Sequence, residues 1–586
     1  MSDSTHTTAA AHTTAAALLQ GMRTAGIEYV FVNLGSDHSA FMEAMAAGRA
    51  RGDAGRYPRF ITCPSEMVAL SAAHGYAQVS GRLQAVLVHV ECGTQALGGA
   101  VHNAAKGRIP VLILAGTSPA SQEGEARGSR NEFIHWIQDV FDQRGIVRGY
   151  MRYDNELRLG ANAPQVLQRA LQFACSDPRG PVYLMAAREV LEAEVAPVSI
   201  DPRQWPPLAA GGLAPEDAAD LARTLAQARR PLIVTSYLGR KVAAVPELVR
   251  LAQQVGAGVL DSVPNYLNFP PQDPLYLGSQ WNENRQHPAL AEADVVLVID
   301  SDVPWIPLIN HPSPAARVLH IDVDPLKEQM PLWYIHAQRS YRADAATALH
   351  QINQELAALA PGSAPDAAAV AERRAHWAGM HAARQVQLQQ LEQPPARGLT
   401  AEYLTACVRE AIGPEALVLS ESVTNFHVVA NHAGRVQPGT YFVSGGGSLG
   451  WNGGAAVGAK LAQPQRQVVA FTGDGSYLFS QPATVHWLAR HCRAPFLQVI
   501  FNNRGWRAPK FSALGVHPQG HASRTEELDI RFEPPPDYAG IAAAAGGAHG
   551  EAVREPEEVA PALERALAAI REGRSAVIDA WLTATA

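Results

Sequence analysis

Short apolar runs alternate with alanine-rich stretches of helical length along the whole chain. Each run is bounded by Gly, Asp or Pro, and it is apolar at successive positions rather than at every second one. Strands that are apolar on both faces and separated by helices are typical of parallel sheets covered on both sides. We therefore predict the α/β fold class, with three doubly wound parallel-sheet domains. The expected strands begin near residues 28, 85, 111, 231, 294, 317, 416, 467, 496 and 575.

Two stretches rich in proline and glycine divide this pattern into three parts. They cover about residues 196–215 and 358–398, and the second contains a stretch of Ala, Arg and Gln that predicts a helix. Clustered prolines end helices and central strands, so these stretches predict domain boundaries. The predicted domains are 12–195, 212–357 and 398–586. Within the first, residues 66–81 predict an amphipathic helix.

Charge and hydropathy exclude two classes of partner. The 586 residues include 48 Lys and Arg against 55 Asp and Glu, which leaves no basic excess to neutralise a nucleic acid backbone. The longest apolar runs, at 85–90 and 109–116, are far shorter than the ~20 residues of a membrane helix. We expect neither nucleic acid nor a membrane as a partner.

The N-terminal segment and the cysteines indicate a cytoplasmic protein. The first twenty residues contain Asp3 and no basic region, unlike a secretory signal. The cysteines are odd in number, widely spaced and free of any C-x-x-C pair, which fits a reducing compartment.

The most informative motif lies in the third domain. A strand is expected to end in GDGS at residues 473–476, and the next one to end in Asn502-Asn503, with 26 residues between GDG and NN. A carboxylate and a carboxamide at neighbouring strand ends are oxygen ligands that can share one Mg²⁺, whose other positions are filled by phosphate and water. The spacing therefore predicts a magnesium diphosphate site, whereas either motif alone would be read as a turn or a helix cap.

A second motif favours another class of enzyme. Residues 445–450, GGGSLG, match G-x-G-x-x-G, and Asp474 lies about 24 residues further on, where a nicotinamide enzyme places its ribose-binding acid. An NAD(P)-dependent dehydrogenase is thus an alternative, although it gives the Asn pair no role.

With GDG-x26-NN, the chain resembles the thiamine-diphosphate-dependent decarboxylase and acetolactate synthase superfamily over nearly its whole length. The resemblance implies a pyrimidine-binding domain first, a central domain second and a diphosphate-binding domain third. It also implies that thiamine diphosphate and Mg²⁺ are the cofactors. The implied metal ligands are Asp474, Asn503 and the backbone carbonyl of Gly505.

The same resemblance implies further contacts to thiamine diphosphate. Residues 443–464 look like the segment that holds the cofactor bent, with Leu449 between its two rings and Gly447 as a backbone acceptor. Thr424 corresponds to a hydroxyl that contacts the diphosphate. The remaining cofactor-binding candidates are Gly473, Gly475, Ser476 and Trp506.

This family is also marked by a glutamate in its first domain. Residues 60–81 resemble the part of the family that carries this glutamate, and the matching residue is Glu66. Such a carboxylate bonds the pyrimidine ring and lets that ring act as an intramolecular acid and base. Taken alone, Glu66 would be read as an acidic residue favoured at a helix N-terminus.

Two segments resemble benzoylformate decarboxylase in particular. Residues 32–41 place Ser36 at an active-site serine that could hold a substrate carboxylate, and residues 88–105 place His89 at an active-site histidine that could donate a proton. The alternatives are a structural histidine and a helix N-cap serine. The chain departs from the pattern at Thr94-Gln95-Ala96 and at 115–119, where a glutamine is common.

These residues predict non-oxidative decarboxylation of a 2-oxo acid through a C2 adduct and an enamine, with Glu66, His89 and Ser36 as catalytic residues. An acetolactate-synthase-like carboligase is the alternative within the family. The resemblance implies a homodimer or homotetramer with active sites at the subunit interface. No phosphate-binding pattern occurs in 212–357, so no FAD is predicted there, and His486 and His491 are expected at the surface.

Overall fold

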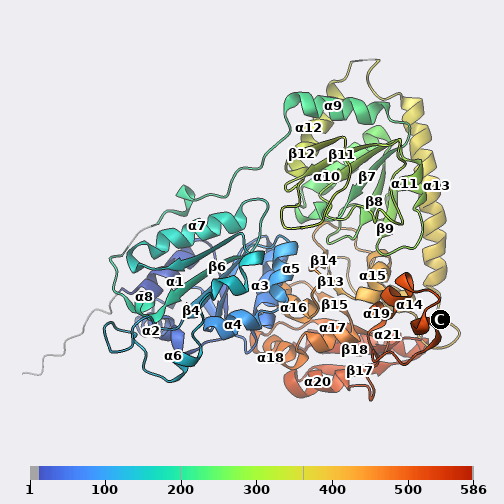
Figure 1. The fold of residues 1–586 in the computed structure, drawn as a ribbon. Helices are drawn as coiled ribbons and strands as arrows, with labels where there is room; N and C mark the ends of the chain where they lie inside the picture. Colours follow the sequence, from blue (N-terminus) through green and yellow to red (C-terminus); the bar gives the residue numbers. More distant parts are fainter. Residues whose placement is uncertain (1–11, 198–199, 361, 584–586) are drawn as a thin grey trace, which may run out of the picture. The chain divides into compact units, whose positions relative to one another are not determined.

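The computed structural model describes residues 12–197, 200–360 and 362–583. The chain divides into two compact units. The first contains the residues up to Leu208 together with Gly445–Gln463, and the second contains Ala209–Ser444 and the residues from Pro464 onward. The two units contain three parallel six-stranded sheets flanked by helices, which confirms the predicted α/β class (Figure 1).

The first unit contains one sheet, with the strand order β2-β1-β3-β4-β6-β5. Alternate residues of its central strands join the apolar side chains of α1, α2, α7 and α8 in one core, and α3 packs on β1, β3 and β4. Short inner strands that are buried on both faces explain the continuous apolar runs of the sequence. The strands are β1 (Tyr29–Val32), β2 (Arg59–Thr62), β3 (Gln84–Val88), β4 (Val111–Thr117), β5 (Tyr153–Leu157) and β6 (Val182–Ala187).

The helices of this unit include one from far along the chain. They are α1 (Thr14–Thr24), η1 (Ser36–His38), α2 (Ser39–Ala50), α3 (Glu66–Ser80), α4 (Val90–Ala96), α5 (Ala100–Lys106), α6 (Ile134–Ile137), α7 (Ala163–Cys175), α8 (Arg188–Glu192) and α16 (Trp451–Ala462).

Helices α3 and α16 pack unusually closely because small residues line their contact. A Cβ atom on Gly458 would lie 1.9 Å from the Ala72 carbonyl oxygen, and one on Gly75 would lie 2.2 Å from the Ala455 carbonyl oxygen. With α16 on its outer side, α3 is buried at every residue from Glu66 to Ala77. The expectation of an amphipathic helix is therefore wrong, because a second helix covers the face that would otherwise meet water.

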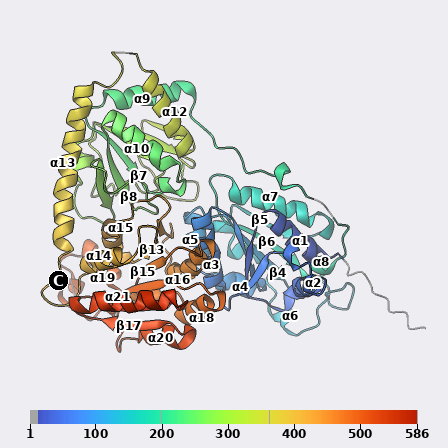
Figure 2. The same cartoon turned by 180° about the vertical axis from the view of Figure 1, so that it is seen from behind.

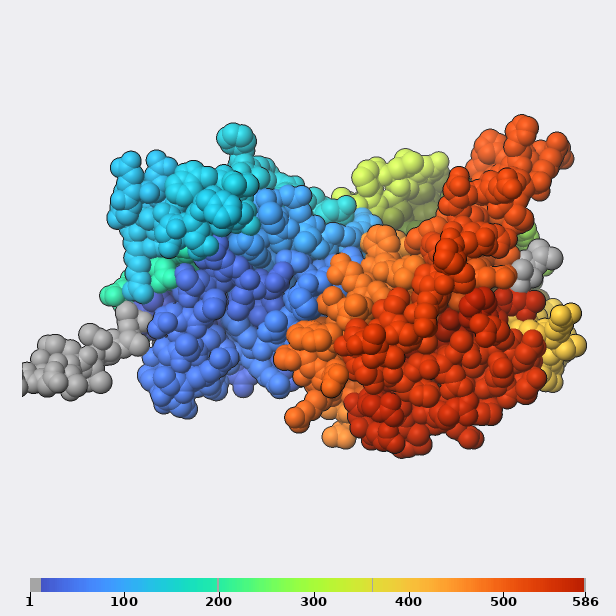
Figure 3. All heavy atoms as spheres, turned by 90° about the horizontal axis from the view of Figure 1, so that it is seen from below, coloured from blue at the N-terminus to red at the C-terminus, as the bar shows by residue number. Residues whose placement is uncertain are grey.

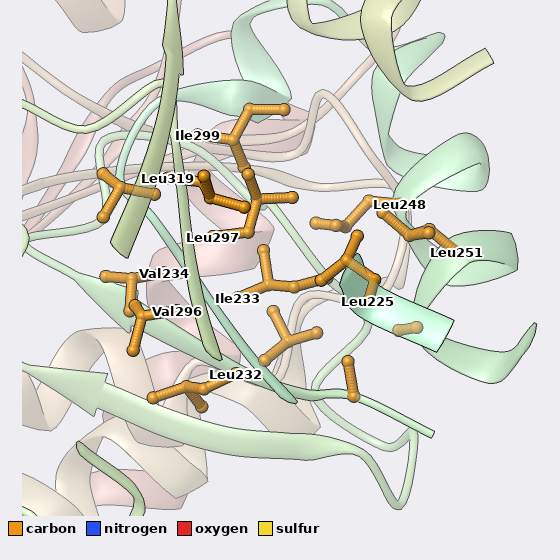
Figure 4. Packing of buried hydrophobic residues seen from close by; sticks show 14 of the residues in the cluster. Leu225, Leu232, Ile233, Val234, Leu248, Leu251, Val296, Leu297, Ile299 and Leu319 are labelled. Carbon is orange, nitrogen blue, oxygen red and sulfur yellow. The ribbon is translucent and has the colours of Figure 1, made fainter. Parts of the chain in front are cut away.

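The second unit contains the other two sheets. The central sheet has the order β12-β11-β10-β7-β8-β9, and leucine, isoleucine and valine side chains of its strands pack against α9 and α10 (Figure 4). Its elements are α9 (Pro215–Gln227), β7 (Pro231–Thr235), α10 (Ala244–Val255), β8 (Gly258–Ser262), β9 (Tyr276–Gln280), α11 (Pro288–Glu292), β10 (Val295–Ile299), β11 (Arg317–Asp322), β12 (Arg339–Arg342) and α12 (Ala345–Ala358).

The proline-flanked stretch after this sheet forms the long helix α13 (Ala367–Leu391), as predicted (Figure 2). Its Trp377 is fully buried in the central core, and its Arg373 donates hydrogen bonds to the carbonyls of Val255 and Ala226. The stretch is thus a packed part of the second unit rather than a loose linker.

The last sheet has the order β14-β13-β15-β16-β18-β17. Its elements are α14 (Ala401–Ala411), β13 (Leu417–Glu421), η8 (Val423–Asn425), α15 (Phe426–His432), β14 (Tyr441–Val443), β15 (Val468–Gly473), α17 (Asp474–Phe479), α18 (Pro482–Cys492), β16 (Leu497–Asn502), α19 (Arg507–Val516), α20 (Tyr538–Gly546), β17 (His549–Val553), α21 (Pro556–Arg571) and β18 (Ala576–Trp581). All ten expected strands are present. Within the described ranges, no helix combines the length and apolar character that a membrane crossing requires.

Candidate active site

The two halves of the GDG-NN motif lie at neighbouring strand ends in the second unit. Strands β15 and β16 pair in parallel, with Gly473 opposite Phe501, so Asp474 and Asn503 each follow directly after the end of their strand. Asp474 is also the first residue of α17, so the strand ends at the first glycine of the GDGS motif. This arrangement follows from the rule that side chains at the carboxyl ends of parallel strands meet at one edge of the sheet.

Asp474 is a buried carboxylate bonded only to backbone. Its side chain accepts hydrogen bonds from the N–H groups of Gly475, at 2.8 Å, and Gly505, at 2.9 Å. None of the ion pairs among the described residues includes it. Burial raises the pKa of Asp474 to about 6 although these N–H groups lower it. A buried carboxylate without a cation is costly, and a metal ion would remove that cost.

The two adjacent asparagines have different surroundings. Asn502 donates to Asp579 at 2.9 Å and accepts from the backbone N–H of Arg504 at 3.1 Å. In contrast, Asn503 has a buried Oδ1 with no hydrogen-bond partner among the described residues. A buried carbonyl oxygen without a partner requires an explanation.

A magnesium ion fits this donor set. Asp474 and Asn503 offer a carboxylate and a carboxamide oxygen, the ligand types that Mg²⁺ takes in small number beside phosphate and water. Gly505 has φ +145°, and a Cβ there would lie 2.1 Å from the Ile530 carbonyl oxygen, so the turn after Asn503 requires glycine. The described residues contain no group of three or more His, Cys, Asp or Glu with metal-binding spacing, which is the pattern of other metals.

The other candidates of this unit are distributed around Asp474. A Cβ on Gly475 would lie 2.6 Å from the Trp506 ring, so glycine allows the indole to approach the backbone there. Ser476 is buried in α17, whereas Thr424 is half-buried in η8, which contacts β15. Gly473 ends β15, and a Cβ there would meet nothing within 4 Å.

Glu66 occupies the first position of α3 in the first unit. The hydroxyl of Ser65 accepts from the Val68 N–H and thereby begins the helix at this residue. Glu66 is 8% exposed, and its Oε1 accepts a hydrogen bond of 2.7 Å from the Asn33 side chain. A Cβ on Gly93 would lie 3.0 Å from this oxygen. Glu66 is thus a buried carboxylate held by a neutral donor and without a basic partner among the described ion pairs.

The GGGSLG loop is held in place by a side chain of the same unit. Asn103 donates to the Ser448 carbonyl at 2.9 Å and accepts from the Ser448 N–H at 3.1 Å. A Cβ on Gly446 would lie 2.5 Å from the Asn103 Oδ1. The loop therefore uses its backbone groups and its glycine for packing on α5, which disfavours the reading as a dinucleotide-binding turn.

The two residues of this loop that the resemblance singles out are more open. Gly447 is exposed, and its N–H donates to the His102 imidazole at 3.1 Å. Leu449 is half-buried and precedes Gly450, the N-cap of α16, which has φ +95°.

His89 and Asp37 form a short side-chain contact in the same unit. The His89 Nδ1 lies 2.5 Å from the Asp37 Oδ1, and Asp37 is 2% exposed. The hydrogen bond with Asp37, together with the charges of Asp37 and Glu66, raises the pKa of His89 against the opposing effect of burial. His89 is therefore not an isolated histidine in an apolar strand.

Ser36 belongs to a separate cluster of polar groups. Gly35, not Ser36, is the N-cap of η1, so the alternative reading of Ser36 as a helix cap is wrong. The Ser36 hydroxyl instead lies 3.1 Å from the His135 Nε2. The buried Arg188 donates to the Ser36 carbonyl and to the Asn131 side chain.

One surface segment supplies side chains both to the cluster around Ser36 and to His89. Residues 131–141 include α6 and lie at the surface of the first unit, in the cyan region of Figure 3. The inward side chains are His135 and Gln138, and Gln138 contacts the His89 Nε2 at 2.7 Å. The outward side chains include Phe133 and Phe141, which are strongly exposed.

Sequence reasoning missed Asp37, His135, Gln138 and Arg188. Only Asp37 had a usable signal, a charged residue directly after Ser36 in a segment already singled out. One expectation about histidines is also wrong, because His486 is buried and stacks on Phe496, whereas His491 is exposed as expected.

Comparison with known proteins shows the family. The N-terminal TPP binding domain of thiamine pyrophosphate enzymes matches residues 12–146, the central domain matches 218–352, and the C-terminal TPP binding domain matches 422–580. The chain therefore belongs to the thiamine-diphosphate-dependent enzymes. These matches confirm the resemblance seen in the sequence and do not favour a nicotinamide dehydrogenase.

The relatives are enzymes of the lyase and transferase kind. A benzoylformate decarboxylase of Pseudomonas aeruginosa is 27% identical over 94% of this chain and 96% of its own. A protein of the same organism named "probable 2-ketoarginine decarboxylase" is 26% identical over 89% and 86% of the two chains. A sulfoacetaldehyde acetyltransferase of Castellaniella defragrans is 26% identical over 97% and 92%.

Solved structures show the same fold. A benzoylformate decarboxylase of Polynucleobacter necessarius gives a TM-score of 0.77 at 18% identity, with 97% of this chain and 98% of the other covered. A 4-hydroxybenzoylformate decarboxylase of Rhodococcus jostii gives 0.75 at 22% identity, with 97% and 99% covered.

Proposed function

We propose that this chain catalyses the Mg²⁺- and thiamine-diphosphate-dependent, non-oxidative decarboxylation of a 2-oxo acid to an aldehyde. Family membership supports the cofactor, and the relatives named as decarboxylases support the reaction class. The buried carboxylate of Asp474 and the unpaired oxygen of Asn503 support the metal.

The residues that would hold the cofactor are those around the two strand ends and the GGGSLG loop. Asp474, Asn503 and the carbonyl of Gly505 would bind Mg²⁺. Bound thiamine diphosphate supplies an electron sink for the pair released when CO₂ leaves. The cofactor contacts in this proposal are Thr424, Gly447, Leu449, Gly473, Gly475, Ser476 and Trp506.

Three residues of the first unit would act on the pyrimidine ring and the substrate. Glu66 would accept a hydrogen bond from the ring, which its burial and single neutral donor favour. His89 would hold the proton that replaces CO₂. Ser36 would donate its hydroxyl to the substrate carboxylate, beside the imidazole of His135.

The observation that carries the choice of decarboxylation is the imidazole of His89. Aldehyde release consumes one proton at the carbon that loses CO₂, whereas carboligation places a second carbonyl carbon there. An imidazole whose pKa is raised by Asp37 is suited to carry that proton near neutral pH. Carboligation is the second candidate, because relatives include acetolactate synthases and acetyltransferases.

We further propose that the chain works as a homodimer or homotetramer with active sites at subunit interfaces, as the family resemblance implies. Sedimentation with and without cofactor would measure the assembly. A monomer that is fully active would contradict this part of the proposal.

The deciding experiment is a panel of 2-oxo acids supplied to the protein with thiamine diphosphate and Mg²⁺. The expected result is CO₂ release with an equal amount of aldehyde for at least one acid. Parallel reactions with an acceptor aldehyde would report coupling. Calorimetry should show binding of thiamine diphosphate only when Mg²⁺ is present, and the absence of binding would contradict the proposal.

A further inference from the structure

We propose that Asp37 is a positioning residue that presents His89 as the proton donor and thereby directs the reaction to a released aldehyde. This inference rests on the proposed decarboxylation and extends it to a residue to which neither the metal site nor the resemblance to benzoylformate decarboxylase assigns a role. Three features of the structure support it. They are the contact between Asp37 and His89, the glycines that leave room for this contact, and the hydrogen bonds of the neighbouring His38 and Gln138.

The contact joins the middle residue of η1 to the residue that directly follows β3. The Asp37 Oδ1 lies 2.5 Å from the His89 Nδ1, and its Oδ2 accepts the Val90 N–H at 3.1 Å. Asp37 thus bonds the imidazole and the next peptide group together. Because Asp37 holds both the Nδ1 of His89 and the N–H of the next residue, the imidazole has a fixed orientation. Its Nε2 lies at the ring edge opposite Asp37.

Two glycines and one strained residue make this geometry possible. A Cβ on Gly35 would lie 1.9 Å from the His89 Nδ1, and one on Gly116 would lie 1.9 Å from the Asp37 Oδ2. Val90 has φ +35°, a rare conformation for a β-branched residue. Such backbone strain persists only where the surroundings determine it, and it concentrates at functional sites.

The second imidazole beside Asp37 has a fixed proton. His38 is fully buried, and its Nδ1 accepts the Gly35 N–H at 3.0 Å, so this nitrogen carries no proton. Its Nε2, which then carries the proton, lies 3.2 Å from the Asp37 Oδ2 but is buried without a hydrogen-bond partner among the described residues. Burial lowers the pKa of His38. The imidazole beside Asp37 whose pKa is raised is therefore His89 and not His38.

Gln138 can serve the His89 Nε2 in both protonation states. Its amide nitrogen lies 2.7 Å from that atom, and its Oε1 is buried without a hydrogen-bond partner among the described residues. The amide donates to neutral imidazole, and turned by 180° it accepts from imidazolium. A proton can thus be held at Nε2 and released from it without leaving either state unpaired.

The charges that face His89 act mainly in one direction. Asp37 from η1, Gln138 and Glu66 from α3 raise its pKa, whereas burial lowers it. On α4, Glu91 bonds Cys92 and Gln95. On the far side of Asp37, the pKa of His135 is lowered by burial and Arg188. His89 is therefore the imidazole of this cluster whose pKa is raised and which has a carboxylate as its hydrogen-bond partner.

The proton balance of the step is simple. The C–C bond to the carboxylate breaks and CO₂ leaves, the electron pair stays on the carbon, and the His89 Nε2 delivers one proton to that carbon. Solvent restores the proton to His89. Without a positioned donor, the same carbon is available to a second carbonyl compound and the product is coupled.

The test compares Asp37→Asn with the wild type and with Asp53→Asn. Asparagine keeps the shape and can still accept the Val90 N–H but lacks the charge. Asp53 pairs with Arg51 and Arg56 in the same domain and serves as the matched control. Histidine labelled at Cε1 gives the titration of His89 in cofactor-free protein, and the His89→Gln variant assigns its signal. Product analysis then gives the ratio of aldehyde to coupled product.

In Asp37→Asn, the titration midpoint of His89 should fall by about one pH unit or more. The aldehyde share should fall at neutral pH while CO₂ release continues, and Asp53→Asn should match the wild type. An unchanged midpoint, or a shifted midpoint with an unchanged aldehyde share, would refute the proposal. If Asp37→Asn fails to fold, the wild type must still show a strongly downfield Nδ1 proton coupled to labelled histidine, and its absence would refute the contact. Absence of CO₂ release from wild type would instead refute the proposed function.

Discussion

Asp37 and Asp474 are equally buried, at 2% exposure each, yet their carboxyl groups differ in acidity. The pKa of Asp37 lies below its ordinary value, because His38, His89 and the Val90 N–H outweigh the effect of burial. The pKa of Asp474 is raised to about 6, because burial outweighs three backbone N–H groups.

The difference lies in the partners of the two carboxylates: Asp37 has histidine side chains beside it, whereas Asp474 has backbone N–H groups only. Asp37 has its cation within the fold, whereas Asp474 has donors of partial charge only. A carboxylate of the second kind gains most from a metal ion. Four experiments, ordered from the largest expected effect to the smallest, test the roles assigned to the buried carboxylates and to the residues beside Asp474.

Asp474→Ala should abolish Mg²⁺-dependent binding of thiamine diphosphate. The change removes the only carboxylate among the predicted metal ligands, so calorimetry should show no heat at cofactor concentrations that saturate the wild type. Asp537→Ala, an acidic residue of the same unit outside the predicted ligand set, is the control. Normal binding by Asp474→Ala would show that the metal is held elsewhere.

Glu66→Gln should lower turnover by roughly 100-fold or more, the usual contribution of a positioned acid or base. Cofactor affinity should be nearly unchanged, because glutamine keeps the size of the side chain. Steady-state rates and calorimetry on the same preparation measure the two effects. The exposed Glu43→Gln should behave as wild type, and equal loss of rate in both variants would contradict the role of Glu66.

Asn503→Ala and Asn502→Ala should affect different properties: the first should weaken metal binding, and the second should lower the stability of the fold. Loss of a direct ligand at Asn503 should weaken Mg²⁺ binding by at least about tenfold, the lower end of what loss of a supporting residue costs. Asn502→Ala leaves Asp579 with an unpaired oxygen and should cost about 1–3 kcal/mol of stability. Metal titration and thermal unfolding separate the two, and equal effects would contradict the distinction.

Ionisation of Asp474 should destabilise the cofactor-free protein as pH rises from about 4 to 7, relative to a variant without this carboxyl group. The folded-state pKa of Asp474, about 6, lies above its ordinary value of 3.8, so folding favours the protonated form and is penalised once the group ionises. The difference corresponds to about 3 kcal/mol. Melting temperatures of the wild type and Asp474→Asn should therefore diverge across this range, and parallel curves would argue against the raised pKa.

The sequence predicted the inner strands better than the edges. Every expected run formed a strand because inner parallel strands are apolar on both faces. The edge strands β5, β12 and β17 contain YDNEL, RSYR and HGEAV, in which polar residues hide the pattern. Helix α3 was misread because nothing in residues 66–81 indicates that α16, nearly 400 positions later, covers it.

The candidate site was predictable where its residues share a motif. Asp474, Asn503 and Gly505 follow from fixed spacing and strand ends. The Asp37–His89 contact does not, because 52 positions separate the partners and only the β1–β3 pairing brings their strand ends together. Gln138 and His135 come from a loop whose path leaves no periodic signal.

The placement of α16 beside α3 has a consequence for how this polypeptide is made. The residues of the first unit up to Leu208 are continuous in sequence, but the small-residue face of α3 is covered by the later segment Gly445–Gln463. During synthesis, the ribosome must therefore complete more than three quarters of the chain before the first unit can finish folding. A fragment ending at residue 208 would expose that face to water and should associate or aggregate, whereas the same fragment joined through a linker to 445–463 should remain dispersed.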